Sequence, residues 1–107
     1  MEQLGVRQLH EMMARGEPIC LVDVRQPWEH ELVHLPGAVL LPLDQLEDLV
    51  DEFSPPHDAL VVTYCHHGIR SLNGAAMLQQ LGHARVASLA GGIDRWAVEI
   101  DPSLRRY

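Results

Sequence analysis

The chain has 107 residues, and its 15 acidic and 8 basic side chains give a formal net charge of −7. All eight basic residues are arginine, which excludes Schiff-base chemistry on a lysine. An acidic chain without a basic stripe is also a poor match for nucleic acid or for an anionic membrane surface. The length predicts a single domain over residues 1–107.

The two cysteines, Cys20 and Cys65, are too few for a disulfide framework. No apolar run approaches the length of a membrane span, and the opening residues MEQLGVRQLHEMM contain no signal-peptide core. We therefore expect a cytoplasmic monomer with reduced thiols.

Helices and strands are expected to alternate in the first half of the chain. Residues 6–17 carry apolar side chains at helical spacing and include a glycine stop. The run ICLVDV (19–24) is typical of a buried parallel strand. Pro27 favours the first position of a short helix, PWEHELV, and AVLLPL (38–43) predicts a second strand. Asp44 is expected to cap a surface helix, QLEDLVDEF.

The same alternation continues in the second half. A strand is predicted at 59–64 (ALVVTY), a helix at 70–82 that is closed by Gly82, and a strand at 85–89 (RVASL). An AGG turn and a final helix, IDRWAVEI, follow. This order predicts an α/β fold: a three-layer α/β/α domain with a mostly parallel central sheet.

Residues that could take part in binding or catalysis follow three of the predicted strands: Arg25, Cys65 and the pair Gly91–Gly92. Ligands of open α/β sheets bind beyond the carboxyl ends of the strands, and in a parallel sheet these ends share one edge. We therefore expect a functional site at this edge.

The segment VVTYCHHGIRS places Cys65 between a buried strand and a helix. Gly68 permits a positive φ, so the loop can direct successive N–H groups, and the dipole of the following helix, at one point. Such an arrangement, with the fixed charge of Arg70, favours a thiolate. An inert buried cysteine followed by surface histidines is the alternative reading of the same residues.

Three motifs in order carry a resemblance to a known family. LVDVRQPWEHELVHLPGAVLLPL looks like the first signature of single-domain rhodaneses, VVTYCHHGIRS is similar to their active loop, and LAGGIDRW resembles their closing motif. The chain is thus identified as a member of the rhodanese, or thiosulfate sulfurtransferase-like, family, and the resemblance implies the rhodanese-like fold.

The resemblance implies that Cys65 is the catalytic nucleophile and carries a persulfide. It also implies that His66, His67, Gly68, Ile69 and Arg70 form the substrate-binding cradle. Asp23, Arg25 and Ser71 are expected to support this loop from behind. No metal and no cofactor are expected.

The expected reaction is a ping-pong sulfur transfer. The Cys65 thiolate takes the outer sulfur of a small-molecule donor such as thiosulfate, and cyanide, a thiol or a protein accepts it. Many thiosulfate-active relatives carry a lysine or arginine inside the loop, whereas this loop has His66 and His67. This difference predicts stronger activity at lower pH, where histidine is cationic.

Two alternatives stay open on the same fold. Phosphatases and arsenate reductases separate the cysteine and the arginine by one residue more, and the smaller loop here fits a single sulfur better than a tetrahedral oxyanion. Rhodanese-like interaction modules usually lack the cysteine that this chain retains.

The stretch HELVH (30–34) matches the zinc-protease pattern H-E-x-x-H. Leu35 precedes a proline, so a helix should end at or before His34, which leaves a poor platform for two metal ligands. The third ligand of the longer zinc pattern would fall on Leu40. We interpret HELVH as a chance match, with Glu29 and His34 belonging to the rhodanese-like signature.

The remaining residues are assigned structural roles. Cys20 is expected to be a packed core thiol, and Asp23 and Arg25 are expected to form an ion pair or a loop brace. Trp28 and Trp96 are predicted to be packing anchors. The tail DPSLRRY is predicted to be a surface extension.

Overall fold

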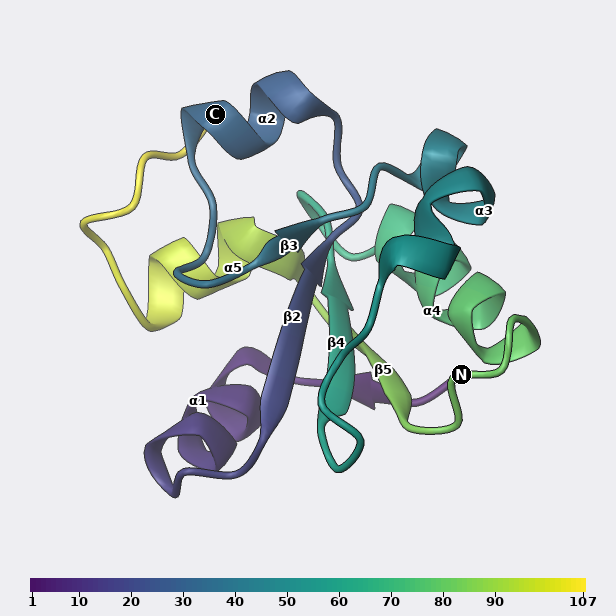
Figure 1. Ribbon diagram of the computed structural model, residues 1–107. Helices are drawn as coiled ribbons and strands as arrows, with labels where there is room; N and C mark the ends of the chain where they lie inside the picture. The colour runs from purple at the N-terminus through teal and green to yellow at the C-terminus, as the bar shows by residue number, and fades with distance from the viewer.

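A parallel five-stranded sheet with strand order β1-β5-β4-β2-β3 forms the centre of the computed structural model, which describes residues 1–107 (Figure 1). The strands are β1 (Gln3–Leu4), β2 (Ile19–Asp23), β3 (Val39–Leu40), β4 (Leu60–Tyr64) and β5 (Val86–Leu89). The α-helices are α1 (Val6–Ala14), α2 (Pro27–Leu32), α3 (Leu46–Leu49), α4 (Arg70–Gln80) and α5 (Gly92–Glu99), and two short 3-10 helices are η1 (Leu43–Gln45) and η2 (Val50–Glu52).

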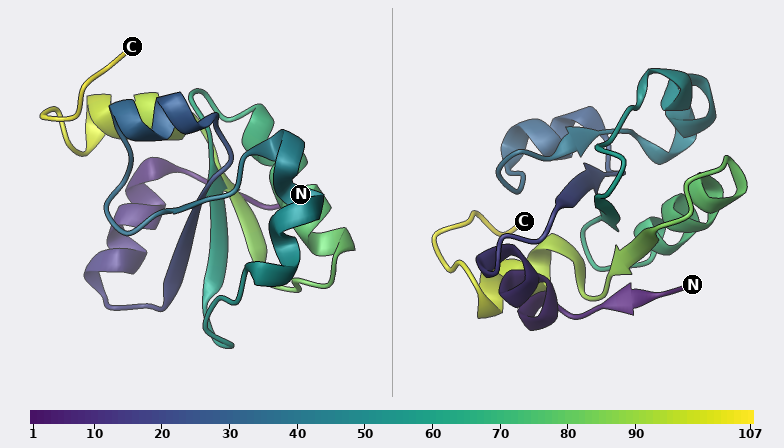
Figure 2. Two further views of the ribbon diagram at one scale, coloured as in Figure 1. Left: turned by 45° about the horizontal axis from the view of Figure 1, so that its top comes forward. Right: turned by 60° about the horizontal axis from the view of Figure 1, so that its bottom comes forward.

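The helices lie on both faces of the sheet, which confirms the three-layer prediction (Figure 2). Helices α1 and α5 cover one face, while α3 and α4 cover the other. Successive side chains of β4 and of the residue after it alternate between the two layers: Val62 and Tyr64 pack with α1 and α5, whereas Val61 and Cys65 pack toward α4. This alternation directs Cys65 toward the layer that contains the start of α4.

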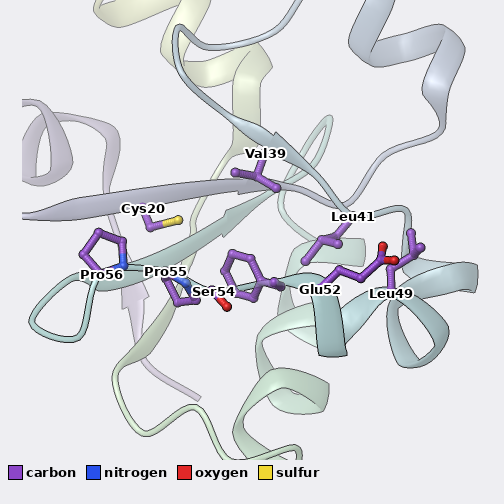
Figure 3. A pocket seen from close by; sticks show the side chains of 9 residues that line it. Cys20, Val39, Leu41, Leu49, Glu52, Ser54, Pro55 and Pro56 are labelled. Atoms are coloured by element: carbon purple, nitrogen blue, oxygen red, sulfur yellow. The ribbon is translucent and has the colours of Figure 1, made fainter.

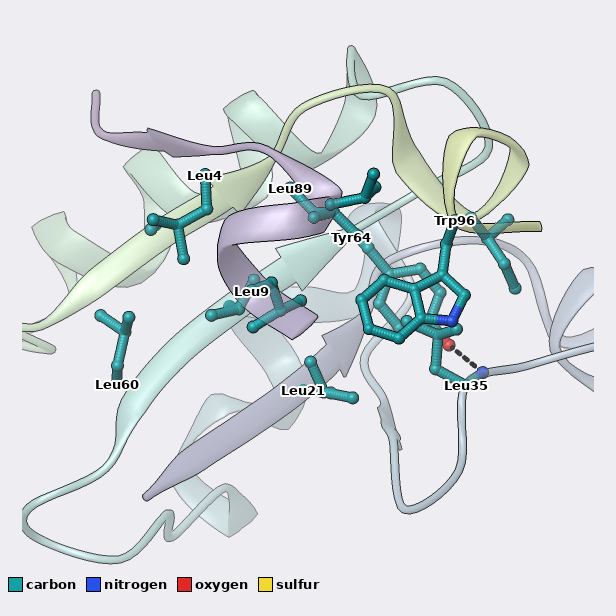
Figure 4. Packing of buried hydrophobic residues seen from close by; sticks show 12 residues of the cluster. Leu4, Leu9, Leu21, Leu35, Leu60, Tyr64, Leu89 and Trp96 are labelled. Carbon is teal, nitrogen blue, oxygen red and sulfur yellow. Dashed lines mark hydrogen bonds between the residues drawn. The ribbon is translucent and has the colours of Figure 1, made fainter. Parts of the chain in front are cut away.

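The core between the sheet and helices α1 and α5 is built from leucines together with Tyr64 and Trp96 (Figure 4). Trp96 is 7% exposed, which confirms it as a packing anchor. The buried hydroxyl of Tyr64 accepts a hydrogen bond from the backbone N–H of Leu35 at 3.1 Å. The bond holds the segment after α2 against the end of β4, where the candidate site lies.

Some predicted elements differ from the structure. Strand β3 contains only Val39–Leu40 rather than residues 38–43, because Pro42 lacks an N–H and Leu43 already begins η1. The two-residue strand β1 was not predicted, since two residues carry no periodic signal.

The predicted helix over QLEDLVDEF is instead divided into η1, α3 and η2, and Asp44 does not cap it. The carboxylate of Asp44 accepts a hydrogen bond from Gln26 at 3.2 Å. Like charges at i,i+4 spacing, such as those of Glu47 and Asp51, oppose a continuous α-helix through this acidic segment.

The structure has no helix that is both long and apolar enough to cross a membrane.

Candidate active site

Cys65 follows the last residue of β4 and is 1% exposed. Its backbone continues into the loop 65–69, after which α4 begins at Arg70. The predicted strand–loop–helix arrangement around this cysteine is therefore confirmed. The sulfur lies near the N-terminus of an α-helix of 11 residues, where the backbone dipoles favour negative charge.

Two backbone N–H groups point at the sulfur. Gly68 donates to Sγ of Cys65 at 3.0 Å, and Ser71 donates to the same atom at 3.4 Å. The Ser71 hydroxyl is also 3.6 Å from Sγ. Sequence reasoning placed Ser71 behind the loop, but the structure places it in direct contact with the sulfur, because the first turn of α4 folds back toward β4.

A buried polar chain holds Ser71 in place. Its hydroxyl is 2.8 Å from the hydroxyl of Ser88 on β5, and its backbone carbonyl accepts a hydrogen bond from the Thr63 hydroxyl at 2.8 Å. All three residues are fully buried. Satisfied polar groups at these positions fix the start of α4 relative to the sheet.

The N-terminus of α5 anchors the other side of the loop. Ile93 donates its N–H to the carbonyl of Cys65 at 2.9 Å, and Asp94 donates to the carbonyl of His66 at 3.1 Å. A Cβ atom on Gly92, which has a φ of +61°, would lie 2.5 Å from both carbonyl oxygens. Glycine is therefore required where α5 meets the loop, in agreement with the expected tight turn at Gly91–Gly92.

Arg70 forms a two-pronged ion pair with Glu29 of α2. Nη1 and Nη2 donate to the two carboxylate oxygens at 2.6 and 2.9 Å. Burial raises the pKa of Glu29, but the hydrogen bonds from Arg70 and Tyr107 outweigh that effect and lower the pKa to about 2. The same pair raises the pKa of Arg70. The loop arginine is thus fixed in position, and its charge is matched by a carboxylate.

Asp23 and Arg25 form the predicted ion pair beneath α2, with Nη2 of Arg25 2.7 Å from Oδ2 of Asp23. Both side chains are completely buried. Burial by itself raises the pKa of Asp23. The hydrogen bonds from Arg25 and His30 together have the larger, opposite effect, so the pKa of Asp23 lies below its usual value. Arg25 also donates to the carbonyl of Val33 at 2.6 Å, which braces the end of α2.

His66 and His67 stack on each other with ring centroids 4.0 Å apart. Burial, followed by the neighbouring His67, lowers the pKa of His66, and its Nε2 has no hydrogen-bond partner. His66 therefore becomes cationic only at a lower pH than an ordinary histidine. Any gain in activity that depends on its charge is expected at that lower pH. His67 is exposed, and its Nε2 is 3.8 Å from Asp94.

Tyr107 reaches the loop, contrary to the prediction that DPSLRRY is only a surface extension. Its ring stacks on His66 with centroids 3.9 Å apart and an interplanar angle of 6°. Its hydroxyl donates to Glu29 at 2.6 Å and accepts from Arg25 at 2.8 Å. The segment after α5 runs back to α2 (Figure 1). Trp28, predicted to be a packing anchor, is instead 62% exposed beside Tyr107.

One group of side chains has the composition of a metal site: His66, His67 and Asp94 have ligand atoms within 4.8 Å of one another. The Asp94 carboxylate, however, accepts two hydrogen bonds from Arg106 at 2.9 and 3.1 Å. The residues of HELVH are arranged differently from a zinc pair. Helix α2 ends at Leu32, before His34, and Nδ1 of His30 is 2.8 Å from Asp23.

Cys20 is half-buried and lines a pocket of about 480 Å³ between β2 and the segment around Phe53 (Figure 3). Burial raises the pKa of its thiol. Cys20 pairs with Val61 in the sheet register, four residues before Cys65, which corresponds to about 13 Å along a strand. The pocket contains no residue of the loop 65–69, and Cys20 is too distant to form a disulfide with Cys65.

Sequence reasoning did not identify several residues around the site. Glu29 was recognised as part of the rhodanese-like signature, but its ion pair with Arg70 was not predicted. Ser88, Asp94 and Tyr107 were not predicted to belong to the site. Each contacts the loop, or a residue in contact with it, across a long separation in sequence. A buried serine pair and an acidic residue in the first turn of α5 carry no local signal for such contacts.

Known protein families and solved structures include relatives of this chain. The sequence pattern of the family described as "Rhodanese-like domain" matches residues 5–99. A protein of Allochromatium vinosum named "Sulfurtransferase" is 37% identical over 95 residues, which cover 89% of this chain and 87% of that protein. A probable adenylyltransferase/sulfurtransferase, MoeZ, of Mycobacterium tuberculosis is 33% identical over 101 residues.

The match to MoeZ covers 94% of this chain but only 26% of the relative, so the chain spans about a quarter of that protein's length. Among solved structures, a rhodanese-like domain protein from Staphylococcus aureus has a TM-score of 0.82 at 24% identity, covering 100% of this chain and 99% of that one. This likeness concerns the fold.

Proposed function

Because the chain belongs to the family of rhodanese-like domains, we propose that it is a sulfurtransferase in which Cys65 carries the transferred sulfur as a persulfide. The observation that carries this proposal is the position of Sγ: it is buried at the end of β4 and accepts hydrogen bonds from the N–H groups of Gly68 and Ser71. These donors stabilise negative charge on the sulfur.

The proposed first step is a displacement at the outer sulfur of the donor. With thiosulfate, the Cys65 thiolate forms a new S–S bond to that sulfur, and the bond between the two donor sulfurs breaks. Sulfite leaves as a dianion with the electron pair of the broken bond, and the enzyme holds Cys–S–S⁻. The total charge of −3 is the same before and after the step, so no proton or external oxidant is required.

The second step reverses the roles. A nucleophilic acceptor attacks the outer sulfur of the persulfide, and the Cys65 thiolate is released. Cyanide becomes thiocyanate, whereas a thiol or a protein thiol becomes a persulfide. The donor and acceptor bind at different times, so the kinetics are ping-pong.

The loop offers further donors for the outer sulfur. The backbone N–H groups of His66, His67 and Ile69 are not used in hydrogen bonds within the chain. They belong to the same loop that supplies Gly68, and as unused donors they are available to hold the anionic outer sulfur of a persulfide. Arg70 lies at the start of α4, at the edge of this loop, where its ion pair with Glu29 holds the guanidinium in position.

The test is intact-protein mass spectrometry, without reductant, after incubation with thiosulfate or with a thiosulfonate. We expect wild type to gain the mass of one sulfur atom and to lose it on addition of cyanide. Cys20→Ser should behave like wild type, because Cys20 lies outside the loop, and Cys65→Ser should gain nothing. If no donor adds sulfur to wild type, the proposal is wrong and a non-catalytic interaction module is favoured.

A further inference from the structure

The segment after α5 is fixed to the candidate site at two points. Tyr107 stacks on His66 and joins the Glu29 carboxylate and the Arg25 guanidinium through its hydroxyl. The preceding residue, Arg106, binds both oxygens of Asp94. Burial, followed by the hydrogen bond to Glu29, raises the pKa of Tyr107 to about 12, so the hydroxyl stays protonated and donates at neutral pH.

The charges around the loop are matched in pairs. The guanidinium of Arg70 is paired with Glu29. That of Arg106 is paired with Asp94, and that of Arg25 with Asp23. Each of these three arginines therefore has a carboxylate partner, and the chain as a whole has a net charge of −7. A dianionic donor therefore meets three arginines whose charges are already compensated, and the net negative charge of the chain repels it.

His66 adds no fixed charge either. It lies between the rings of His67 and Tyr107, at centroid distances of 4.0 and 3.9 Å. Its surroundings lower its pKa, so it is neutral at neutral pH.

The rim of the site is aromatic and apolar. Trp28 is 62% exposed and meets the ring of Tyr107 edge-on at 6.0 Å. Ile69, within the loop itself, is 74% exposed. Large apolar side chains with this exposure, one in the loop and one beside Tyr107, provide contact area for an organic substituent.

We propose that Tyr107 is the specificity-determining residue of this site, and that the charge-matched, aromatic rim it forms with Trp28 and His66 favours organic sulfane-sulfur donors of low charge over the dianion thiosulfate. This inference rests on the proposed sulfur transfer and specifies the donor class. Tyr107 acts by contacting the donor's organic group and by holding His66 and Glu29 in place.

The organic donor used as a probe is benzenethiosulfonate. The Cys65 thiolate forms a bond to its terminal sulfur, the S–S bond of the donor breaks, and benzenesulfinate leaves with the electron pair. The charge is −2 on both sides of the step. Methanethiosulfonate reacts in the same way with the same charge but without a ring, and thiosulfate transfers the same sulfur from a dianion.

The experiment measures kcat/KM for these three donors, with cyanide as acceptor, in wild type, Tyr107→Ala and Tyr107→Phe. Intrinsic donor reactivity is the same for every variant and cancels when donor ratios are compared between variants. Arg105→Gln is the matched control, because Arg105 lies in the same segment and is exposed. Urea unfolding of each variant reports separately on stability.

We expect wild type to prefer benzenethiosulfonate over methanethiosulfonate and to use thiosulfate least well. In Tyr107→Ala the ratio of the first two should fall about three- to tenfold, which corresponds to the loss of one aromatic contact. Tyr107→Phe retains the ring, so its ratio of kcat/KM for benzenethiosulfonate to that for methanethiosulfonate should stay close to the wild-type value. Arg105→Gln should have the same ratio as wild type. Raising the ionic strength should increase kcat/KM for thiosulfate more steeply than for either monoanion.

An unchanged donor ratio in Tyr107→Ala, or a wild-type preference for thiosulfate, would overturn the inference while leaving sulfur transfer by Cys65 intact. If no donor adds sulfur to Cys65 in the mass measurement, the proposed function is wrong, and so is this inference, which rests on it.

Discussion

A pair of glycines with nearly the same φ angle gives a sharp test of the loop geometry. Gly68 has a φ of +105° and Gly82 a φ of +106°. A Cβ on Gly82 meets nothing within 4 Å, whereas a Cβ on Gly68 would lie 3.0 Å from the backbone nitrogen of Gly91. Substitution by alanine therefore separates backbone strain from contact with the loop.

The magnitudes follow from these two differences. An L-residue at this φ costs about 1–3 kcal/mol, so Gly82→Ala should lower the free energy of unfolding by that amount. Gly68→Ala should lose about 1–3 kcal/mol more, because the backbone of the loop or of Gly91 must move. For a chain of this size, each kcal/mol corresponds to a fall in Tm of about 4 °C.

Displacement of the loop should affect sulfur loading in Gly68→Ala but not in Gly82→Ala. The N–H of Gly68 is 3.0 Å from Sγ of Cys65, and displacing this donor should slow sulfur loading by about tenfold or more. Gly82 closes α4 at its far end, so Gly82→Ala should load at the wild-type rate once corrected for the folded fraction.

The assay combines urea unfolding with time-resolved mass spectrometry of persulfide formation. If Gly68→Ala were no less stable than Gly82→Ala and loaded at the wild-type rate, then the Gly68 amide would not hold the sulfur, and the close contact with Gly91 would be wrong.

Further predictions concern the buried polar groups around the loop. Asp23→Asn leaves the buried guanidinium of Arg25 without its charge partner, and urea unfolding should show a loss of about 3–5 kcal/mol; a loss below 1 kcal/mol would contradict the buried pair. Glu29 has a pKa of about 2 in the folded chain, compared with an ordinary 4.5, so its contribution, up to about 3 kcal/mol, is fully present above pH 4.5 and is lost as the pH falls toward 2. Unfolding titrations of wild type and Glu29→Gln should therefore differ in slope between these pH values, and parallel curves would refute the assignment. Ser71→Ala leaves the buried hydroxyl of Ser88 without its partner, so the free energy of unfolding should fall by about 1–3 kcal/mol and sulfur loading should be slower. Unchanged stability in urea unfolding would contradict this role of Ser71.

The sequence by itself determined the order of helices and strands, the parallel sheet, and the position of Cys65 between β4 and α4. It also determined where glycine is required, at Gly68 and Gly91–Gly92. These features follow from local rules: hydrophobic periodicity, the restricted conformations of proline and glycine, and the convergence of parallel strand ends at one edge. The Asp23–Arg25 pair could be predicted because its members are two residues apart in extended chain at the end of β2.

Only the tertiary structure decided which groups surround Cys65 beyond its own loop. Glu29 and Arg70 are 41 residues apart, and Tyr107 is 78 residues from Glu29, yet their side chains are in hydrogen-bond contact. Such pairings depend on how α2 and the segment after α5 fold over the sheet edge, and no periodicity or motif in a single sequence encodes that path. For the same reason the sequence did not show that Trp28, a large apolar residue of a type usually found in cores, is exposed at the rim of the site.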